Sequence, residues 1–219
     1  MPSFEQIKKD RSIKTYIESA DRSLAALGYT EHSFAHVGRV SDVCSGILVE
    51  LGYDEHTVEL AKIAAYLHDI GNLVNRVDHS QSGAIMAFRI LDKMGMAAED
   101  ISTVVTAIGN HDEGCGIPVS PVAAALILAD KSDVRRSRVR NSDASLFDIH
   151  DRVNYSVESS KLEISPDKKE ITLYLVIDTS ISSIMDYFEI FLNRMILCRK
   201  AADKLGLAFR LVINEQKIM

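Results

Sequence analysis

Apolar residues recur every three or four positions between residues 4 and 131, which is the spacing of one face of an α-helix. The pattern predicts helices over residues 4–27, 31–51, 54–69, 79–94 and 98–110, and a further helix that begins at Pro121. Gly28 and Gly52 are expected to end two of them, because glycine readily adopts the left-handed conformation that follows a helix. Such a series of amphipathic helices favours a helical bundle.

The pattern changes after Ser156. Apolar residues then alternate with other residues from Ile171 to Ile177, and a turn at 166–169 precedes them, which predicts a β-hairpin. A long amphipathic helix from Ser180 and a last strand over 209–213 complete a β-β-α-β unit. We therefore predict a mainly α protein, with a helical domain over residues 1–155 and a small α+β extension over residues 156–219 packed on it. Packing, dimerisation and a substrate lid all stay open as roles for this extension.

The composition is that of an ordinary globular protein. Of 219 residues, 47% are hydrophobic and 26% are charged, and the net charge of -6 argues against general nucleic-acid binding, which needs a basic face. The three cysteines are far apart and have no metal-binding spacing, so we expect reduced thiols in a cytoplasmic protein. No apolar run approaches the ~20 residues of a membrane span, so no membrane partner is expected. A homodimer is left open.

The apolar stretch that precedes His68 ends unusually, in His68, Asp69, Ile70 and Gly71. Burying a carboxylate costs roughly several kcal/mol unless a positive group lies beside it. A metal ion is the simplest such group, and Gly71 is expected to end the helix so that both side chains can converge on it.

Other metal-competent side chains lie at the edges of the remaining apolar helices: His36, His79, His111 and Asp130. Imidazole and carboxylate ligands suit Mn, Fe, Co, Ni and Zn, and the lack of a cysteine among them argues against a closed structural zinc site. Six candidate ligands exceed the four that one tetrahedral ion requires. Two divalent transition-metal ions that share a carboxylate would use them better.

The ordered series His, His-Asp, His, His, Asp over roughly residues 30–135 resembles the HD superfamily of metal-dependent phosphohydrolases. The resemblance implies an HD-domain helical bundle of the dinuclear, six-ligand subgroup. In that scheme His36, His68, Asp69 and Asp130 hold one ion, and His79 and His111 hold the second, with Asp69 as the bridge.

The implied activity is cleavage of a phosphomonoester or phosphodiester in a small molecule, such as a nucleotide, by a metal-bridged hydroxide. Asp69 and Lys131 are the candidate catalytic residues, and Lys131 is expected to place its ammonium group on the phosphate. Arg39 is interpreted either as a second phosphate contact or as a salt-bridge partner. The basic run 135–141 is either a solvated turn or a phosphate-attracting rim. His32 is interpreted either as a residue that approaches the substrate or, preferably, as one in the first turn of its helix, and His56 and His150 are expected on the surface.

Two alternative functions use the same ligands. Some HD-type proteins are dinuclear iron oxygenases that cleave C–C or C–P bonds, and they show the same six-ligand pattern. A regulatory protein that binds metal without turnover is the other alternative, with the C-terminal unit as its interaction element.

Overall fold

The computed structural model describes residues 1–219. The helices are α1 (Phe4–Lys9), α2 (Arg11–Ala26), α3 (Phe34–Leu51), α4 (Glu55–Leu67), α5 (His79–Lys93), α6 (Ala98–Gly109), α7 (Pro121–Lys131), α8 (Ile149–Ser156) and α9 (Ile184–Lys204). Short 3-10 helices lie at η1 (Ile70–Leu73), η2 (Arg136–Arg138) and η3 (Ala144–Leu146), and the strands are β1 (Val157–Ile164), β2 (Glu170–Ile177), β3 (Ala208–Ile213) and β4 (Gln216–Lys217). The prediction of a mainly helical protein with a small C-terminal sheet is confirmed.

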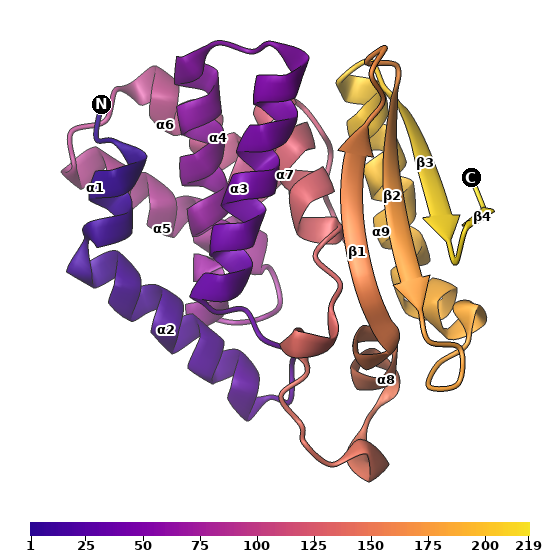
Figure 1. Ribbon diagram of the computed structural model, residues 1–219. Coiled ribbons are helices and arrows are strands. Elements are labelled where there is room, and N and C mark those ends of the chain that lie inside the picture. The colour runs from indigo at the N-terminus through magenta and orange to yellow at the C-terminus, as the bar shows by residue number, and fades with distance from the viewer.

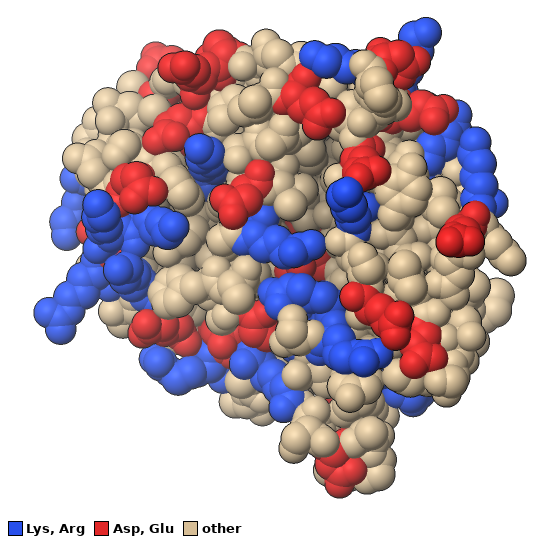
Figure 2. Space-filling view, viewed as in Figure 1, with Lys and Arg blue, Asp and Glu red and all other residues tan.

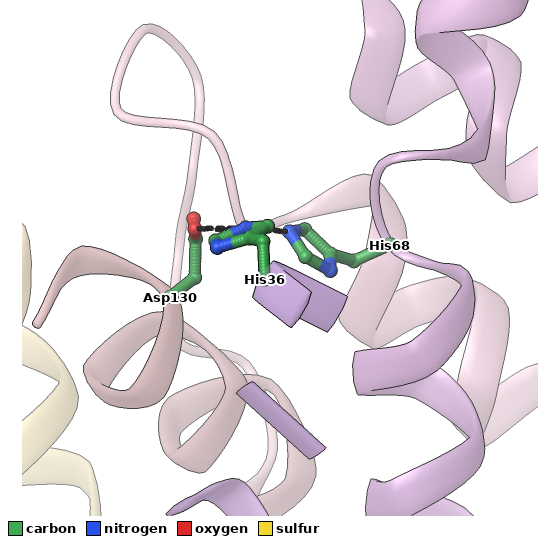
Figure 3. A group of neighbouring side chains, drawn as sticks. All are labelled: His36, His68 and Asp130. Atoms are coloured by element: carbon green, nitrogen blue, oxygen red, sulfur yellow. Dashed lines mark hydrogen bonds and ion pairs between the residues drawn. The ribbon is translucent and has the colours of Figure 1, made fainter. Parts of the chain in front are cut away.

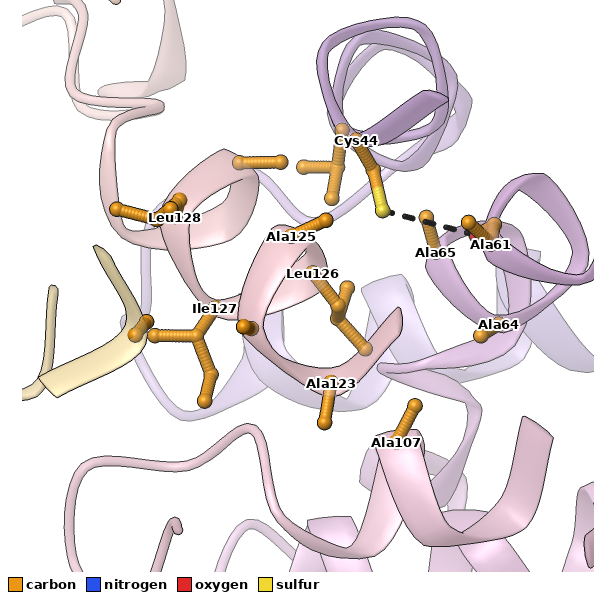
Figure 4. Packing of buried hydrophobic residues seen from close by; sticks show 14 of the residues in the cluster. Cys44, Ala61, Ala64, Ala65, Ala107, Ala123, Ala125, Leu126, Ile127 and Leu128 are labelled. Atoms are coloured by element: carbon orange, nitrogen blue, oxygen red, sulfur yellow. Dashed lines mark hydrogen bonds between the residues drawn. The ribbon is translucent and has the colours of Figure 1, made fainter. Parts of the chain in front are cut away.

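Helix α7 forms the centre of the molecule. Its residues from Val122 to Ala129 are all buried, so this helix has no polar face, as expected for a helix surrounded by others. Helices α3, α4, α6 and α9 pack around it, and its alanines Ala123 and Ala125 let neighbouring backbones approach closely (Figures 1 and 4). Asp130 lies in the last turn of this helix, which fixes it firmly inside the bundle.

The C-terminal unit is a four-stranded sheet in the order β1-β2-β3-β4. Strands β1 and β2 form the predicted antiparallel hairpin, and β3 pairs with β2 in parallel after the chain has passed through α9. Helix α9 lies behind the sheet and also packs against α7 (Figure 1). One continuous hydrophobic cluster therefore joins the bundle to the sheet. The division of the chain at residue 155 stays a prediction.

The predicted first helix is in fact two helices. Asp10 adopts an extended conformation (φ -63°, ψ 127°) and its carboxylate accepts hydrogen bonds from the backbone N–H groups of Ser12 and Ile13. It therefore ends α1 and caps α2, because the N-terminal N–H groups of a helix need such an acceptor. The periodicity continues across the break, which is why it predicts a single helix.

Two other predicted helices begin later than expected. Helix α3 starts at Phe34 after the cap Ser33, so His32 lies outside it. Helix α9 starts at Ile184, where Ser183 and Asp186 form a reciprocal capping box. None of the helices combines the length and the apolar character that a membrane crossing requires.

Gly71 has a different role from the predicted one. It lies within η1 and its φ is not positive, so it is not a left-handed helix end. A Cβ atom at this position would lie 2.0 Å from the backbone oxygen of His79 and 2.4 Å from the backbone nitrogen of Gly83. Only glycine allows η1 to approach the start of α5 this closely. This contact brings His68 and Asp69 next to His79.

Candidate metal centre

Separate elements deliver the six predicted ligands to one place. His36 lies in the first turn of α3, His68 and Asp69 follow the end of α4, and His79 is the first residue of α5. His111 follows α6, and Asp130 lies near the end of α7. All four histidines are at most 3% exposed and Asp69 is 6% exposed, so the imidazoles and the bridging carboxylate are shielded from solvent.

The first group of donor atoms consists of His36, His68, Asp69 and Asp130. The Nε2 atom of His36 lies 3.3 Å from Nε2 of His68 and 3.4 Å from Oδ1 of Asp130. Oδ2 of Asp69 lies 3.2 Å from Nε2 of His68 and 3.5 Å from Nε2 of His36. Figure 3 shows His36, His68 and Asp130 converging from three helical segments. All four donors therefore face a common point.

The second group uses the other oxygen of the same aspartate. Oδ1 of Asp69 lies 3.5 Å from Nε2 of His79 and 3.9 Å from Nε2 of His111, and the two imidazole nitrogens are 3.2 Å apart. Donor atoms of His68, Asp69 and His111 also lie within 4.8 Å of one another, so the two groups adjoin. Each carboxylate oxygen of Asp69 thus faces its own pair of histidines.

The outward-facing Nδ1 atoms of the four histidines all have a hydrogen-bond acceptor. Nδ1 of His68, His79 and His111 lies 2.7, 3.1 and 2.6 Å from the backbone oxygens of Ala65, Arg76 and Ile108, respectively, each three residues earlier. Nδ1 of His36 lies 2.7 Å from Oδ2 of Asp133. These acceptors assign a ring proton to Nδ1 and leave Nε2 directed at the centre, as in metal-bound histidines.

The donor separations fit a metal ion. Ligands about 2.1 Å from a tetrahedral ion are about 3.4 Å from each other, and those of an octahedral ion are about 3.0 Å apart. In the two groups, the separations that involve a histidine Nε2 atom lie between 3.2 and 3.9 Å. Such a set of imidazoles and carboxylates suits divalent transition metals. In the HD scheme these residues would hold the ions.

The electrostatics of the first group also favour a cation. Burial alone would raise the pKa of Asp69, but the neighbouring His68 and His36 hold it well below the usual value. Burial lowers the pKa of His68, but the carboxylates of Asp69 and Asp130 outweigh this effect and raise it to about 10. Both carboxylates therefore stay ionised and attract positive charge into the buried site.

Arg39 lies on the outer side of this centre. Its Nε atom is 3.2 Å from Oδ1 of Asp133, and its Nη2 atom donates to the backbone oxygen of Ser160. Of the two predicted interpretations, the structure places Arg39 in the salt bridge. Asp133, which the sequence analysis did not single out, holds both Arg39 and His36. Asp133 lies two residues beyond the end of α7, and its closeness in the sequence to Asp130 was the signal that could have identified it.

Lys131 is 4% exposed and lies among acidic groups. Its Nζ atom is 2.8 Å from Oδ2 of Asp130 and 2.6 Å from Oε2 of Glu113. Glu113 in turn accepts a hydrogen bond of 3.0 Å from Nε of Arg194 on α9. A chain of alternating charges thus runs from Asp130 to the C-terminal unit. The predicted contact of Lys131 with a substrate phosphate stays a prediction.

A cavity of about 500 Å³ opens beside the metal centre. His32, whose ring centroid is 5.4 Å from that of His36, and Arg76, whose Nη1 atom is 3.4 Å from Nε2 of His79, connect it to the two donor groups. The other residues that line it are Leu27, Gly28, Tyr29, Thr30, Glu113, Arg138, Asp148, His150, Asp151, Asn154, Phe191 and Arg194. Its size suits a ligand of nucleotide dimensions.

Three histidines lie outside the ligand set, and the structure corrects the prediction for one of them. His32 precedes α3 rather than occupying its first turn, and it lines the cavity. His150 is exposed as predicted but also lines the cavity, from α8. His56 is on the surface as expected, where Nε2 pairs with Asp100 at 2.7 Å.

The basic run 135–141 is neither a solvated turn nor a continuous rim. Arg135 binds Glu31 and Asp133, and Arg136 donates to the backbone oxygen of Tyr155. Arg140 pairs with Asp21, so of the four arginines in this run only Arg138 lines the cavity. On the face of the molecule that Figure 1 also shows, Figure 2 has basic side chains near the middle and acidic side chains directly beside them.

Comparisons with known proteins identify the family of the chain. The family model of the HD domain matches residues 33–154, which is more than half of the chain. The chain belongs to the HD domain family. It is 25% identical over 198 residues to an uncharacterized protein of Methanocaldococcus jannaschii, and the match covers 80% of this chain and 75% of that protein. The crystal structure of a predicted HD superfamily hydrolase from an uncultured Thermotogales bacterium is 27% identical, with a TM-score of 0.46, over 60% of this chain and 73% of that one.

Proposed function

We propose that the protein is a metal-dependent phosphohydrolase that cleaves a phosphomonoester or phosphodiester in a small molecule. The observation that carries the proposal is the division of the Asp69 carboxylate, with Oδ2 beside His36 and His68 and Oδ1 beside His79 and His111. A carboxylate in this position can bridge two divalent ions, such as Mn, Fe, Co, Ni or Zn.

The surrounding residues fit this chemistry. Bound divalent ions would activate a water molecule and neutralise charge on the phosphoryl oxygens. Asn72 donates to Oδ1 of Asp69 at 2.9 Å and so fixes the orientation of the bridging carboxylate. Lys131 holds Oδ2 of Asp130, which leaves Oδ1 for the metal centre. Arg76 lies at the mouth of the second donor group, where its guanidinium can bind the phosphate that is cleaved.

The test combines metal analysis with a substrate screen. The protein would be purified, loaded with each of the five metals and assayed with bis-p-nitrophenyl phosphate and a panel of nucleotides. Asp69→Ala should lose both ions and at least a thousandfold of turnover, because it removes the shared ligand. His79→Ala should lose mainly one ion. The matched controls Asp92→Ala and His56→Ala, both at exposed positions, should retain metal and activity.

Two results would contradict the proposal. Oxygen consumption by the iron-loaded protein without phosphate release would favour the dinuclear iron oxygenase. Stoichiometric metal with neither activity across the panel would favour the regulatory alternative. Asp69→Ala protein that still holds two ions at full occupancy would overturn the bridging assignment itself.

A further inference from the structure

Two guanidinium groups from distant parts of the sequence, those of Arg138 and Arg194, line the cavity next to the metal centre. Arg138 belongs to η2 and is 5% exposed. Its Nε atom donates to the backbone oxygen of Glu31 at 2.9 Å and its Nη1 atom to the backbone oxygen of Asp133 at 2.8 Å. Its Nη2 atom makes no hydrogen bond within the protein, although the residue is almost fully buried and lines the cavity. This atom is not one of the fully buried polar atoms that lack a partner, so it keeps accessible surface in the cavity and is available to a ligand there.

Arg194 reaches the same cavity from α9, 40 residues beyond the last residue, 154, that the HD family model matches. Its Nε atom donates to Glu113, and its guanidinium stacks on the ring of Phe191 at 4.3 Å from the centroid. Neither of its Nη atoms makes a hydrogen bond to the protein. The side chain is therefore held in place at Nε and by stacking, while its two terminal amino groups stay available.

The carboxylates in the cavity do not use these free groups. The carboxylate of Glu113 pairs with Nε of Arg194 and with Nζ of Lys131. Asp148 accepts from the backbone N–H of Asp151 as the cap of α8, and neither aspartate pairs with an arginine. Arg138 and Arg194 line the same cavity, where their like charges repel each other. An anion between them would relieve this repulsion.

Arg138 and Arg194 do not contact the candidate metal ligands directly. Arg76 alone of the three cavity arginines has an atom close to a candidate ligand, at 3.4 Å from Nε2 of His79. Arg138 is separated from His36 by Asp133, and Arg194 is separated from Asp130 by Glu113 and Lys131. A phosphate bound at the metal centre would therefore leave Arg138 and Arg194 available to bind another group.

We infer that the substrate is a phosphate ester that carries a second phosphoryl group, and that Arg194 and Arg138 bind this second group. The inference rests on the proposed phosphohydrolase function for the first phosphate. Guanidinium groups bind phosphate oxygens through paired N–H donors, and a cavity of about 500 Å³ can hold both groups and the carbon skeleton between them. The C-terminal unit thus completes the substrate site by supplying Arg194.

The experiment measures binding rather than turnover. A series of α,ω-alkylene bisphosphonates with one to four carbons and the alkyl monophosphonates of equal chain length would be titrated calorimetrically into the Mn-loaded protein. The best bisphosphonate should bind at least tenfold more tightly than its monophosphonate. Arg194→Gln should remove most of this preference while changing monophosphonate affinity less than twofold. Arg199→Gln is the matched control, because Arg199 is an exposed arginine on the same helix.

A purely structural role for Arg194 gives a different result. If Arg194 only anchors Glu113 and Lys131, Arg194→Gln should lower metal content and weaken both classes of phosphonate equally. Arg194→Lys should then restore binding fully, whereas a bidentate phosphate contact predicts only partial recovery. Equal binding of mono- and bisphosphonates by the unmodified protein, or equal loss of both in Arg194→Gln, overturns the inference.

The two proposals can fail separately. A bisphosphonate preference that depends on Arg194, in a protein that hydrolyses no phosphate ester, would retain the second phosphate site and reject the hydrolase. Turnover of monophosphates and bisphosphates with equal kcat/KM, unaffected by Arg194→Gln, would retain the hydrolase and reject the second site.

Discussion

Asp133 holds the imidazole of His36 in place from behind: Oδ2 of the aspartate lies 2.7 Å from Nδ1 of the histidine. The same carboxylate is held by Nε of Arg39 at 3.2 Å and Nε of Arg135 at 2.9 Å. Although burial alone would raise the pKa of Asp133, the hydrogen bond with His36 and the charges of Arg138 and Arg135 hold this pKa far below the usual value. An ionised carboxylate therefore fixes the tautomer and orientation of His36.

Removing the charge of Asp133 should weaken metal binding without removing a ligand. Asp133→Asn is expected to lower metal affinity by about 10- to 100-fold, as other partners of metal-binding histidines do. Competition titration with a fluorescent chelator measures this. Asp42→Asn, at an exposed position of α3, is the control and should leave the affinity unchanged. Unchanged affinity in Asp133→Asn would show that His36 needs no such support.

Gly71 should tolerate no side chain. A Cβ atom there would meet backbone atoms of α5 at 2.0 and 2.4 Å, so Gly71→Ala is expected to destabilise the fold by about 3 kcal/mol and to separate Asp69 from His79. Gly46→Ala is the matched control, because its Cβ would meet nothing within 4 Å and should stabilise α3 by about 0.5–1 kcal/mol. Urea unfolding of the two variants tests the contrast. Equal stability would mean that η1 can shift away from α5.

The ion pair of Glu31 should contribute a pH-dependent part of the stability. Burial alone would raise the pKa of Glu31, but its hydrogen bonds from Ser33 and the charges of Arg138 and Arg135 lower this pKa below the usual value of a glutamate. A lowered folded-state pKa means that the contribution is complete above the unfolded pKa and is lost as the pH falls through the folded one.

Glu31→Gln should therefore be less stable than the unmodified protein at pH 7, by about 1–2 kcal/mol. This difference should shrink as the pH falls below about 4. Chemical unfolding at both pH values measures it, with the exposed Glu50→Gln as the control. A difference that stays constant across this range would assign the stabilisation to hydrogen bonding that does not depend on charge.

The centre of α7 should be the most sensitive part of the core. Leu126 is fully buried among α-helices, and Leu126→Ala is expected to cost about 2–5 kcal/mol of stability because the packed neighbours cannot collapse into the cavity. Leu192→Ala, at a position on α9 that is 48% exposed, should cost less than about 1 kcal/mol. Thermal unfolding gives both values. A smaller loss at Leu126 than at Leu192 would contradict the central place of α7.

The sequence predicts those features that depend on local periodicity. The helical stripes, the hairpin with its turn, and the stops at Gly28 and Gly52 all follow from residue types within a few positions, and both glycines have positive φ as expected. The six candidate ligands could be predicted because each lies at the edge of an apolar helix. Their convergence then follows from the bundle, which the HD family match supports.

The remaining features depend on contacts between distant segments. Asp10 breaks a helix whose periodicity is continuous, because its cap outweighs the pattern. The tight approach of Gly71 requires knowledge of where α5 lies. Arg194 follows His111 by more than eighty residues, and nothing in the sequence around it distinguishes it from the surface arginine Arg199. Only the packing of α9 on α7 brings it to Glu113.

The position of α9 also determines the order in which the molecule can be assembled. All six candidate ligands precede Lys131, so a nascent chain can gather them before the sheet has been synthesised. The flank of α7 that α9 covers stays open until then, and β2 cannot pair with β3 until α9 has been made. Until α9 and β3 have been synthesised, the incomplete chain exposes apolar surface and an unpaired strand edge, which makes it prone to aggregation. Early binding of metal ions would reduce this danger, because the ions would link the five helices that position the ligands while the last part of the chain is still missing.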